Sequence, residues 1–410
     1  MPPRSPLAPT ASPRLSALAG VRLSARACGV RYKDRADVCL IEFAPGSTIA
    51  GVLTRSLSPS APVDWCRQAL KGGKARAILV NSGNANAFTG RLGKASVDRS
   101  VKATVAALAC SRTAVFVAST GVIGEPLPDE RITAGLPALV ADLGADRWAD
   151  AAAAIMTTDT FPKLATRTAR IDGVEVRING IAKGSGMIAP DMATMLAFVA
   201  TDAKLPASIL RPLLKRASDR SFSCTTVDGD TSTSDTLLLV ATGAGSAHAR
   251  IASASDRRLA DFRAKLDDLM VDLACQVVRD GEGASKFVTI DVSGAASDAA
   301  ARRIGLTVAN SPLVKTAIAG ADANWGRIVM AVGRAGERAN RDRLRISIGG
   351  VKVAAQGQRV AGYDEAPVAL HMKGSEIAIA LDVGVGRGRA RVWTCDLTHG
   401  YIDINADYRS

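Results

Sequence analysis

The sequence predicts a mixed α/β protein in which strands and helices alternate along most of the chain. Short apolar runs separated by turn residues predict the strands, and apolar residues that recur every three or four positions predict the helices. A third observation is that strand patterns dominate the C-terminal part. A chain of 410 residues suits about two or three domains. We expect a flexible N-terminus (1–15), a main domain (16–285) and a smaller C-terminal α+β domain (286–410).

The main domain is expected to begin with strands and to continue with helices. The expected elements, in order, are strands within 21–66, helices at 64–70 and 101–110, and a buried strand within 113–125. The last of these, TAVFVASTGVIGE, is largely apolar and contains small and polar residues in its second half. It is expected to deliver Ser119, Thr120 and Gly121 to a turn.

Further elements are expected after position 194. They are a strand at 195–200, a helix at 205–218, a strand at 236–243, a helix at 255–278, and strands at 286–292, 344–356 and 376–384. In the second helix, Leu259, Phe262 and Leu266 begin a series of apolar residues at spacings of three and four. Gly281 suits the end of this helix. Glu282 is therefore expected on the short connection to the next strand, where a side chain is available to a site.

Composition excludes several classes of protein. Contents of 47% hydrophobic and 22% charged residues are ordinary for a folded enzyme, so disorder is not expected. The Lys and Arg residues behind the net charge of +13 are spread along the chain, and few aromatic residues are available to stack on bases, so we expect no nucleic acid partner. No apolar run reaches the about 18 residues that span a bilayer, which predicts a soluble protein without a membrane partner.

The cysteines indicate a reducing compartment, and we expect a cytoplasmic protein. The seven cysteines are odd in number and never spaced as C-x-x-C, which argues against a disulfide framework and a zinc site. Residues 1–15 contain Pro, Ser and two Arg but no acidic residue. Two interpretations of this segment stay open, a mitochondrial transit peptide and a loose bacterial N-terminus.

The segment 180–198, GIAKGSGMIAPDMATMLAF, is the most informative part of the chain. It places one hydroxyl residue, Thr194, between a Gly-rich turn and an apolar run. If the Ala193–Thr194 bond is cut, Thr194 gains a free α-amino group whose pKa is about 7.7 to 8, so that near neutral pH the amine can accept the hydroxyl proton. A threonine that opens a strand is otherwise a structural residue, because β-branched residues favour strands.

This segment resembles the self-cleaving site of the ornithine acetyltransferase family, which comprises bifunctional enzymes of arginine biosynthesis. The resemblance extends over nearly all of the chain after residue 15. The matching blocks are NSGNANAFTG (81–90), STGVIGE (119–125), MTTDTFPK (156–163), KGSGMIAPDMATMLAFVATDA (183–203), VDGDTSTSD (227–235), DGEGASKF (280–287), SPLVKTAIAGADANWGRI (311–328) and CDLTHGYIDINADYRS (395–410).

The resemblance implies an αββα sandwich of the self-cleaving N-terminal-nucleophile type. It implies cleavage between Ala193 and Thr194 and a heterotetramer with two copies each of chains 1–193 and 194–410. The implied reaction is a ping-pong transfer of the acetyl group from N2-acetylornithine to glutamate through acetyl-Thr194, with no metal or organic cofactor. Acetyl-CoA is left open as a second donor. The net positive charge of the chain would attract glutamate and acetyl-CoA, which are both anionic, or it reflects only a generally basic surface.

The resemblance also implies roles for individual residues. Thr120 and Gly121 correspond to the oxyanion-hole pair, which supplies a hydroxyl and an unobstructed backbone N–H. Glu282 would meet the side-chain ammonium of ornithine or position an attacking amine. The implied substrate-binding residues are Thr160, Lys183, Thr194, Glu282, Asn405 and Ser410, with Thr157, Thr158 and Asp159 not excluded as alternatives to Thr160. The family more often ends in threonine where this chain has Ser410.

Other functions are less well supported by the sequence. The main alternative is a self-processing aminopeptidase or amidase of the same architecture, in which water resolves the acyl-enzyme, and a noncatalytic binding protein comes third. GVGRG (384–388) and GEGASK (281–286) lack the spacing of nucleotide-binding loops, and VDGDTSTSD lacks that of a calcium loop. Because no phosphate-binding motif is present, we predict that acetylornithine is a better donor than acetyl-CoA.

Overall fold

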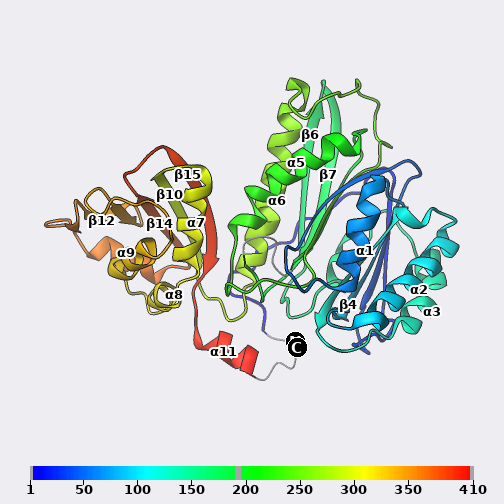
Figure 1. The fold of residues 1–410 in the computed structure, drawn as a ribbon, viewed down its shortest axis with the longest axis horizontal. Helices are drawn as coiled ribbons and strands as arrows, with labels where there is room; N and C mark the ends of the chain where they lie inside the picture. The colour runs from blue at the N-terminus through cyan, green and yellow to red at the C-terminus, as the bar shows by residue number, and fades with distance from the viewer. Residues whose placement is uncertain (1–2, 190–194, 407–410) are drawn as a thin grey trace.

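The computed structural model describes residues 3–189 and 195–406, which form three β-sheets and their covering helices (Figure 1). The first sheet has the order β1-β2-β4-β5 and the second β3-β9-β8-β7-β6. The strands of the first sheet are β1 (Val21–Arg26), β2 (Val38–Phe43), β4 (Ala77–Asn84) and β5 (Val115–Val122). Those of the second are β3 (Thr48–Leu53), β6 (Lys163–Ile171), β7 (Val174–Lys183), β8 (Leu196–Thr201) and β9 (Thr236–Ala241).

These two sheets pack face to face, and each is covered on its outer face by helices. Alternation along β2 shows both faces, since Val38 and Leu40 belong to the cluster under the outer helices, whereas Cys39 and Ile41 belong to the cluster between the sheets. The helices over the first sheet are α1 (Ala61–Ala69), α2 (Gly90–Leu108) and α3 (Asp129–Ala141). α4 (Trp148–Ala154) contacts strands of both sheets.

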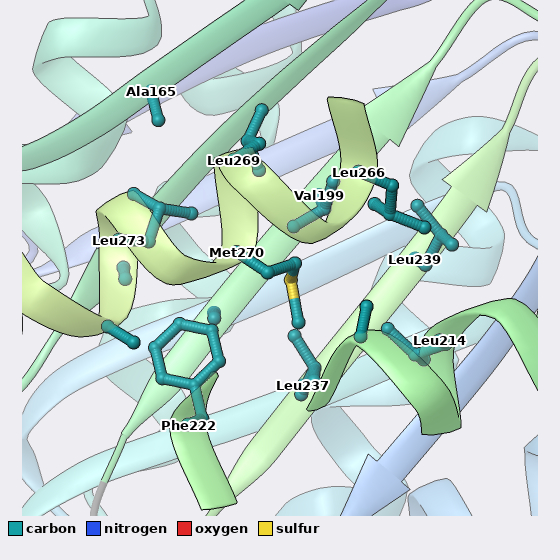
Figure 2. Close-up of a cluster of buried hydrophobic side chains, with 14 of the residues drawn as sticks. Ala165, Val199, Leu214, Phe222, Leu237, Leu239, Leu266, Leu269, Met270 and Leu273 are labelled. Carbon is teal, nitrogen blue, oxygen red and sulfur yellow. The ribbon is translucent and has the colours of Figure 1, made fainter. Parts of the chain in front are cut away.

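The second sheet is covered by α5 (Ala207–Asp219) and α6 (Ala260–Arg279). Figure 2 shows Met270 of α6 packed near Leu237 of β9, and Leu266 of α6 near Leu239 of β9. Both faces of β8 and β9 are buried, which explains why their sequences are continuous apolar runs, with one threonine each at a strand end, rather than alternating. The order helix, sheet, sheet, helix is the expected αββα sandwich, and this prediction is confirmed.

The third sheet lies in the C-terminal part, beside α6 (Figure 1). Its order is β13-β12-β11-β14-β10-β15. The strands are β10 (Phe287–Ala295), β11 (Arg345–Ile348), β12 (Val351–Ala355), β13 (Gln358–Arg359), β14 (Glu376–Asp382) and β15 (Gly388–Cys395). The helices are α7 (Asp298–Ala309), α8 (Pro312–Ala319), α9 (Trp325–Gly333), α10 (Ala366–Lys373) and α11 (His399–Ala406). Its own apolar cluster lies between the sheet and the helices. The domain boundary at residue 285 stays a prediction.

Three local details differ from the sequence-based picture. The helix expected at 101–110 is the second half of α2, which begins at Gly90. Thr120 and Gly121 lie within β5, paired with Ser82 and Gly83 of β4, and not in a turn after the strand. The helix expected at 255–278 begins at Ala260, after a short 3₁₀ turn. Between this helix and β10, Glu282 lies on the connection, as predicted.

The N-terminal segment makes specific contacts. Leu7 and Leu15 are buried, and the backbone N–H of Ser5 donates to Thr160 Oγ1 at 2.9 Å. The flexibility expected for residues 1–15 stays a prediction. In the part of the chain that the structure describes, we find no helix with the length and apolar character needed to cross a membrane.

Candidate active site

Lys183, at the end of β7, and Thr120, near the end of β5, lie together. Lys183 is the last residue of β7 and pairs with Leu196 of β8, which is two residues after Thr194. Its Nζ donates to Thr120 Oγ1 at 3.2 Å and to Thr157 Oγ1 at 2.8 Å. The Lys183 side chain is only 3% exposed. The ammonium group is therefore enclosed and held by two hydroxyl oxygens.

A buried carboxylate, Asp159, organises the surroundings of Lys183. Its Oδ1 accepts hydrogen bonds from Lys163 Nζ at 2.7 Å and from the backbone N–H of Gly184 at 2.6 Å. Its Oδ2 accepts from the backbone N–H of Thr157 at 3.0 Å and lies 3.8 Å from Lys183 Nζ. One side chain thus fixes the loop before β6, the end of β7 and both lysines.

Lys163 connects Asp159 to the end of α6. Its Nζ also donates to Asp280 Oδ2 at 2.6 Å, and neither of the two side chains in this pair is exposed to solvent. Burial would raise the pKa of Asp159, but Lys163 and Lys183 hold that pKa below its usual value. Burial lowers the pKa of Lys183, although Asp159 opposes the shift. Two lysines and two carboxylates make the cluster neutral when all four are charged.

Gly121 is required by the close approach of β4 and β5. Its φ is +129°, and a Cβ added at this position would lie 2.3 Å from the carbonyl carbon of Gly83. No side chain fits in this space, and positive φ is unfavourable for residues other than glycine. The backbone beside Thr120 is consequently free of side-chain bulk.

Glu282 and Asn405 form a second polar group. The backbone N–H of Glu282 donates to the carbonyl of Ser185 at 2.9 Å, and its carboxylate lies against Gly186, where an added Cβ would be 2.3 Å from Oε2. Asn405 Nδ2 donates to Glu282 Oε2 at 2.9 Å. α11 and the α6–β10 connection therefore meet at the Gly-rich turn that precedes position 190.

Two aspartates of VDGDTSTSD hold the chain on either side of residues 190–194. Asp228 accepts from the backbone N–H groups of Met187 at 2.6 Å and Ile188 at 2.9 Å. Asp235 accepts from the N–H of Met195 at 2.9 Å. Burial raises the pKa of the Asp235 carboxyl well above its usual value. Position 194 is thus covalently joined to a residue that Asp235 fixes.

The comparisons with known proteins identify the family. A model described as the ArgJ family matches residues 22–410. The chain belongs to the ArgJ family. A relative from Gluconobacter oxydans (strain 621H), named arginine biosynthesis bifunctional protein ArgJ, is 59% identical over 408 residues, which cover 100% of this chain and 96% of the relative. Membership confirms the resemblance found in the sequence.

Two solved structures of related proteins are also similar to this ArgJ-family chain. An arginine biosynthesis bifunctional protein argJ from Bacillus halodurans is 37% identical, covers 52% of this chain and 98% of its own, and has a TM-score of 0.49. Ornithine acetyltransferase complexed with ornithine from Mycobacterium tuberculosis is 31% identical, covers 48% of this chain and 98% of its own, and has a TM-score of 0.37.

The structure groups only some of the predicted site residues of this ArgJ-family chain. Thr120, Gly121 and Lys183 lie together, and Glu282 and Asn405 lie together. Ala193, Thr194 and Ser410 lie outside the described residues.

Thr160 is turned toward other partners. Its hydroxyl donates to Asp280 Oδ1 at 2.5 Å and accepts from Ser5. Of the hydroxyl residues in TTDT, it is Thr157 that contacts Lys183, an alternative that the sequence had left open. Sequence reasoning missed the positioning contacts of Lys163, Asp228 and Asp235. The available signals were the lysine that ends MTTDTFPK, which is Lys163, and the acidic composition of VDGDTSTSD, which contains the two aspartates.

The described part of this ArgJ-family chain contains no group of three or more His, Cys, Asp or Glu side chains arranged to hold a metal ion. All seven cysteines are free thiols. Burial raises the pKa of Cys66 and of Cys39 to about 12, so these two thiols are unreactive at neutral pH. The side chains that surround Lys183 Nζ are the hydroxyls of Thr120 and Thr157 and the carboxylate of Asp159.

Proposed function

We propose that this chain transfers the acetyl group of N2-acetylornithine to glutamate through an ester on Thr194, after cleaving itself between Ala193 and Thr194. The observation that carries the proposal is the pairing of Lys183 with Leu196 while Lys183 Nζ contacts Thr120 Oγ1. A single residue, Met195, separates the proposed nucleophile Thr194 from the residue opposite Lys183. Membership of the ArgJ family supports the same reaction.

Thr120 is suited to stabilise an oxyanion because its oxygen is already an acceptor. Lys183 Nζ donates to Thr120 Oγ1, which leaves the hydroxyl proton of Thr120 available for another acceptor. That acceptor would be the oxygen of a tetrahedral intermediate, with the backbone N–H of Gly121 as the second donor. We therefore assign Lys183 a positioning role toward Thr120, in addition to the contact with a substrate carboxylate that the family resemblance implies.

Thr194 would then act through its own α-amino group. The amine takes the proton of the hydroxyl while Oγ attacks the acetyl carbonyl carbon of acetylornithine. The amide C–N bond breaks, the proton passes to the departing amine, and ornithine leaves. In the second half, the amine of glutamate attacks the ester, its proton returns through the α-amino group to Oγ, and N-acetylglutamate leaves.

The polar group around Glu282 would recognise the amino-acid substrate. Its carboxylate can pair with an ammonium group, and Asn405 holds it by a hydrogen bond at 2.9 Å. Beside Lys183, we assign the hydroxyl contact with substrate to Thr157 in place of Thr160, because Thr157 contacts Lys183 whereas the hydroxyl of Thr160 already contacts Asp280. Ser410 stays a proposed substrate contact.

The active form we propose is a cytoplasmic heterotetramer of two copies each of 1–193 and 194–410, with no metal or organic cofactor. Acetyl-CoA is a proposed second donor. Glutamate must outcompete water for the ester, so the substrate site must orient the amine.

Mass spectrometry of the purified protein tests the proposal. We expect two chains with a junction between Ala193 and Thr194, and one uncut chain for Thr194→Ala. Incubation of the cleaved protein with acetylornithine should add one acetyl group to the chain that begins at Thr194, and glutamate should remove it. Cleavage at another bond, or an acetylated chain that does not respond to glutamate but is hydrolysed by water, would contradict the proposal and favour an amidase.

A further inference from the structure

Five arginines from distant parts of the sequence line one cleft between α5, the start of α7 and the start of β15. The cleft has a volume of about 580 Å³, within the range of small-molecule sites. We call it the arginine cleft, because it is lined by Arg216, Arg220, Arg302, Arg389 and Arg391. The remaining wall is formed by Asp219, Cys224, Asp298, Ala299 and Ala390.

The carboxylates near the arginine cleft do not balance its charge. Asp267 is shared by Arg216 at 3.0 Å and Arg220 at 3.7 Å. Asp219 pairs with Lys215 at 2.7 Å, and Arg302 lies farther from it, at 3.8 Å.

The remaining two arginines belong to β15. Arg391 is held by Asp291 at 2.7 Å. Asp298 accepts the backbone N–H of Arg389 at 2.8 Å, and within the residues described the guanidinium of Arg389 has no ion pair. Lys215 and the five arginines therefore face four carboxylates, an excess of two positive charges.

This excess matches one chemical group. A phosphate monoester carries a charge of about −1.5 to −2 at neutral pH and offers three acceptor oxygens. Guanidinium groups bind phosphate oxygens with two parallel hydrogen bonds, which is why arginine recurs in phosphate sites. A carboxylate substrate such as glutamate or acetylornithine would leave part of the excess unpaired. A phosphorylated organic molecule fits the charge and the volume of the cleft better.

Only a few residues of chain connect the walls of the arginine cleft to residues beside the proposed acetyl-transfer site. Along β15, Arg391 and Cys395 are four residues apart, about 13 Å at the rise of a strand. Cys395 lies against Gly281, where an added Cβ would be 2.9 Å from its Sγ, and Glu282 follows Gly281. On the opposite wall, Cys224 lies four residues before Asp228, which is at most about 14 Å of chain. A ligand with a long flexible arm could span this distance.

We propose that the arginine cleft binds the nucleotide end of coenzyme A, with its 3′-phosphate monoester on the guanidinium groups. This inference rests on the proposed function, in which acetyl-CoA is the second acetyl donor. It locates a surface for that donor that lies apart from Lys183, Glu282 and Asn405. The nucleotide is held at the cleft, and the pantetheine arm carries the thioester toward Thr194.

Calorimetric titration of the cleaved protein tests binding without requiring any activity. The probe is adenosine 3′,5′-bisphosphate at low salt, with inorganic phosphate as the comparator. We expect the bisphosphate to bind, and Arg302→Gln together with Arg389→Gln to weaken binding by at least about tenfold. The matched control is Arg303→Gln, which removes the neighbouring arginine of α7. Arg303 pairs with Glu337 and does not line the cleft, so bisphosphate binding should be unchanged.

Kinetics then connect the cleft to the donor. In the double variant, the KM for acetyl-CoA should rise by about tenfold relative to the KM for acetylornithine. Absence of bisphosphate binding, or binding that the double variant does not weaken, would overturn the proposal. Equal affinity for inorganic phosphate would assign the cleft to free phosphate and would also overturn it. If acetyl transfer itself is absent while the bisphosphate still binds in the arginine cleft, the proposed function fails and the binding site stands.

Discussion

Replacing Lys183 with methionine tests whether this buried ammonium positions Thr120. Methionine keeps most of the side-chain length but removes the donor to Thr120 Oγ1 at 3.2 Å and to Thr157 Oγ1 at 2.8 Å. A hydrogen bond from a charged group contributes about 1.5 to 3 kcal/mol, and each 1.4 kcal/mol is about tenfold in rate. We therefore expect the rate of Thr194 acetylation to fall about 10- to 150-fold.

The variant should stay folded because Asp159 keeps its other partners. Breaking a buried ion pair costs about 3 to 5 kcal/mol when the remaining charge has no partner. Here Lys163 Nζ stays at 2.7 Å, and the N–H groups of Gly184 and Thr157 stay at 2.6 and 3.0 Å. The loss of stability should therefore be smaller than this range. Thermal unfolding followed by calorimetry measures it.

The assay is single-turnover acetylation of the cleaved protein, followed by intact mass. Thr120→Val and the double variant complete a double-mutant cycle. If Lys183 acts through Thr120, the double variant should react about as slowly as Thr120→Val alone. Additive losses, or a change in KM for acetylornithine without a change in the acetylation rate, would refute the positioning role. Only cleaved chains enter the assay, so that slow self-cleavage cannot be mistaken for slow acetylation.

Three further predictions concern the same site. Thr157→Val should slow acetylation about tenfold because it removes the hydroxyl that contacts Lys183. Thr160→Val should mainly lower the Tm, since Thr160 contacts Asp280 and Ser5. Single-turnover rates and calorimetry measure the two effects separately, and a reversed pattern would return Thr160 to the substrate site. Gly121→Ala should lower both the Tm and the acetylation rate, because the added Cβ would lie 2.3 Å from the carbonyl carbon of Gly83. The matched control is Gly124→Ala, since Gly124 also has a positive φ but an added Cβ would have no neighbour within 4 Å. Equal effects of the two substitutions would show that only the φ angle matters. As the pH increases, kcat/KM should first rise as the α-amine of Thr194 loses its proton, with a pKa of about 7.7 to 8. It should then decrease at alkaline pH as Lys183 loses its charge, and this decrease should begin at a lower pH than for an ordinary lysine, because burial lowers the pKa of Lys183. An alkaline decrease that persists in Lys183→Met would exclude Lys183 as its source.

The layered fold was largely predictable because burial leaves a direct mark on sequence. β8 and β9 are apolar on both faces since one face meets the other sheet and the opposite face meets α5 and α6. The apolar spacing from Leu259 onward gave the end of α6 to within one residue and its start to within five. The sandwich itself came from the family resemblance, since periodicity does not say which sheet a strand joins.

The position of Thr120 shows what periodicity leaves out. A Thr-Gly pair after an apolar run reads as a turn, yet β5 continues through it because Gly121 tolerates a φ of +129° beside Gly83. The arginine cleft could not be predicted from the sequence either, because it depends on how distant segments pack together. Its residues come from positions 216–220, 302 and 389–391, so no local motif records them.

The choice between Thr157 and Thr160 depends on a carboxylate that local sequence could not place. Asp159 has hydroxyl neighbours on both sides, and in an isolated loop either could face a substrate. In the fold, Lys163 ties Asp159 to Asp280, and Asp280 then takes the hydroxyl of Thr160. Thr157 is left to Lys183 because its backbone N–H is bound by the same Asp159. The positions of Thr157 and Thr160 are therefore set by a buried cluster of two lysines and two carboxylates within the protein itself.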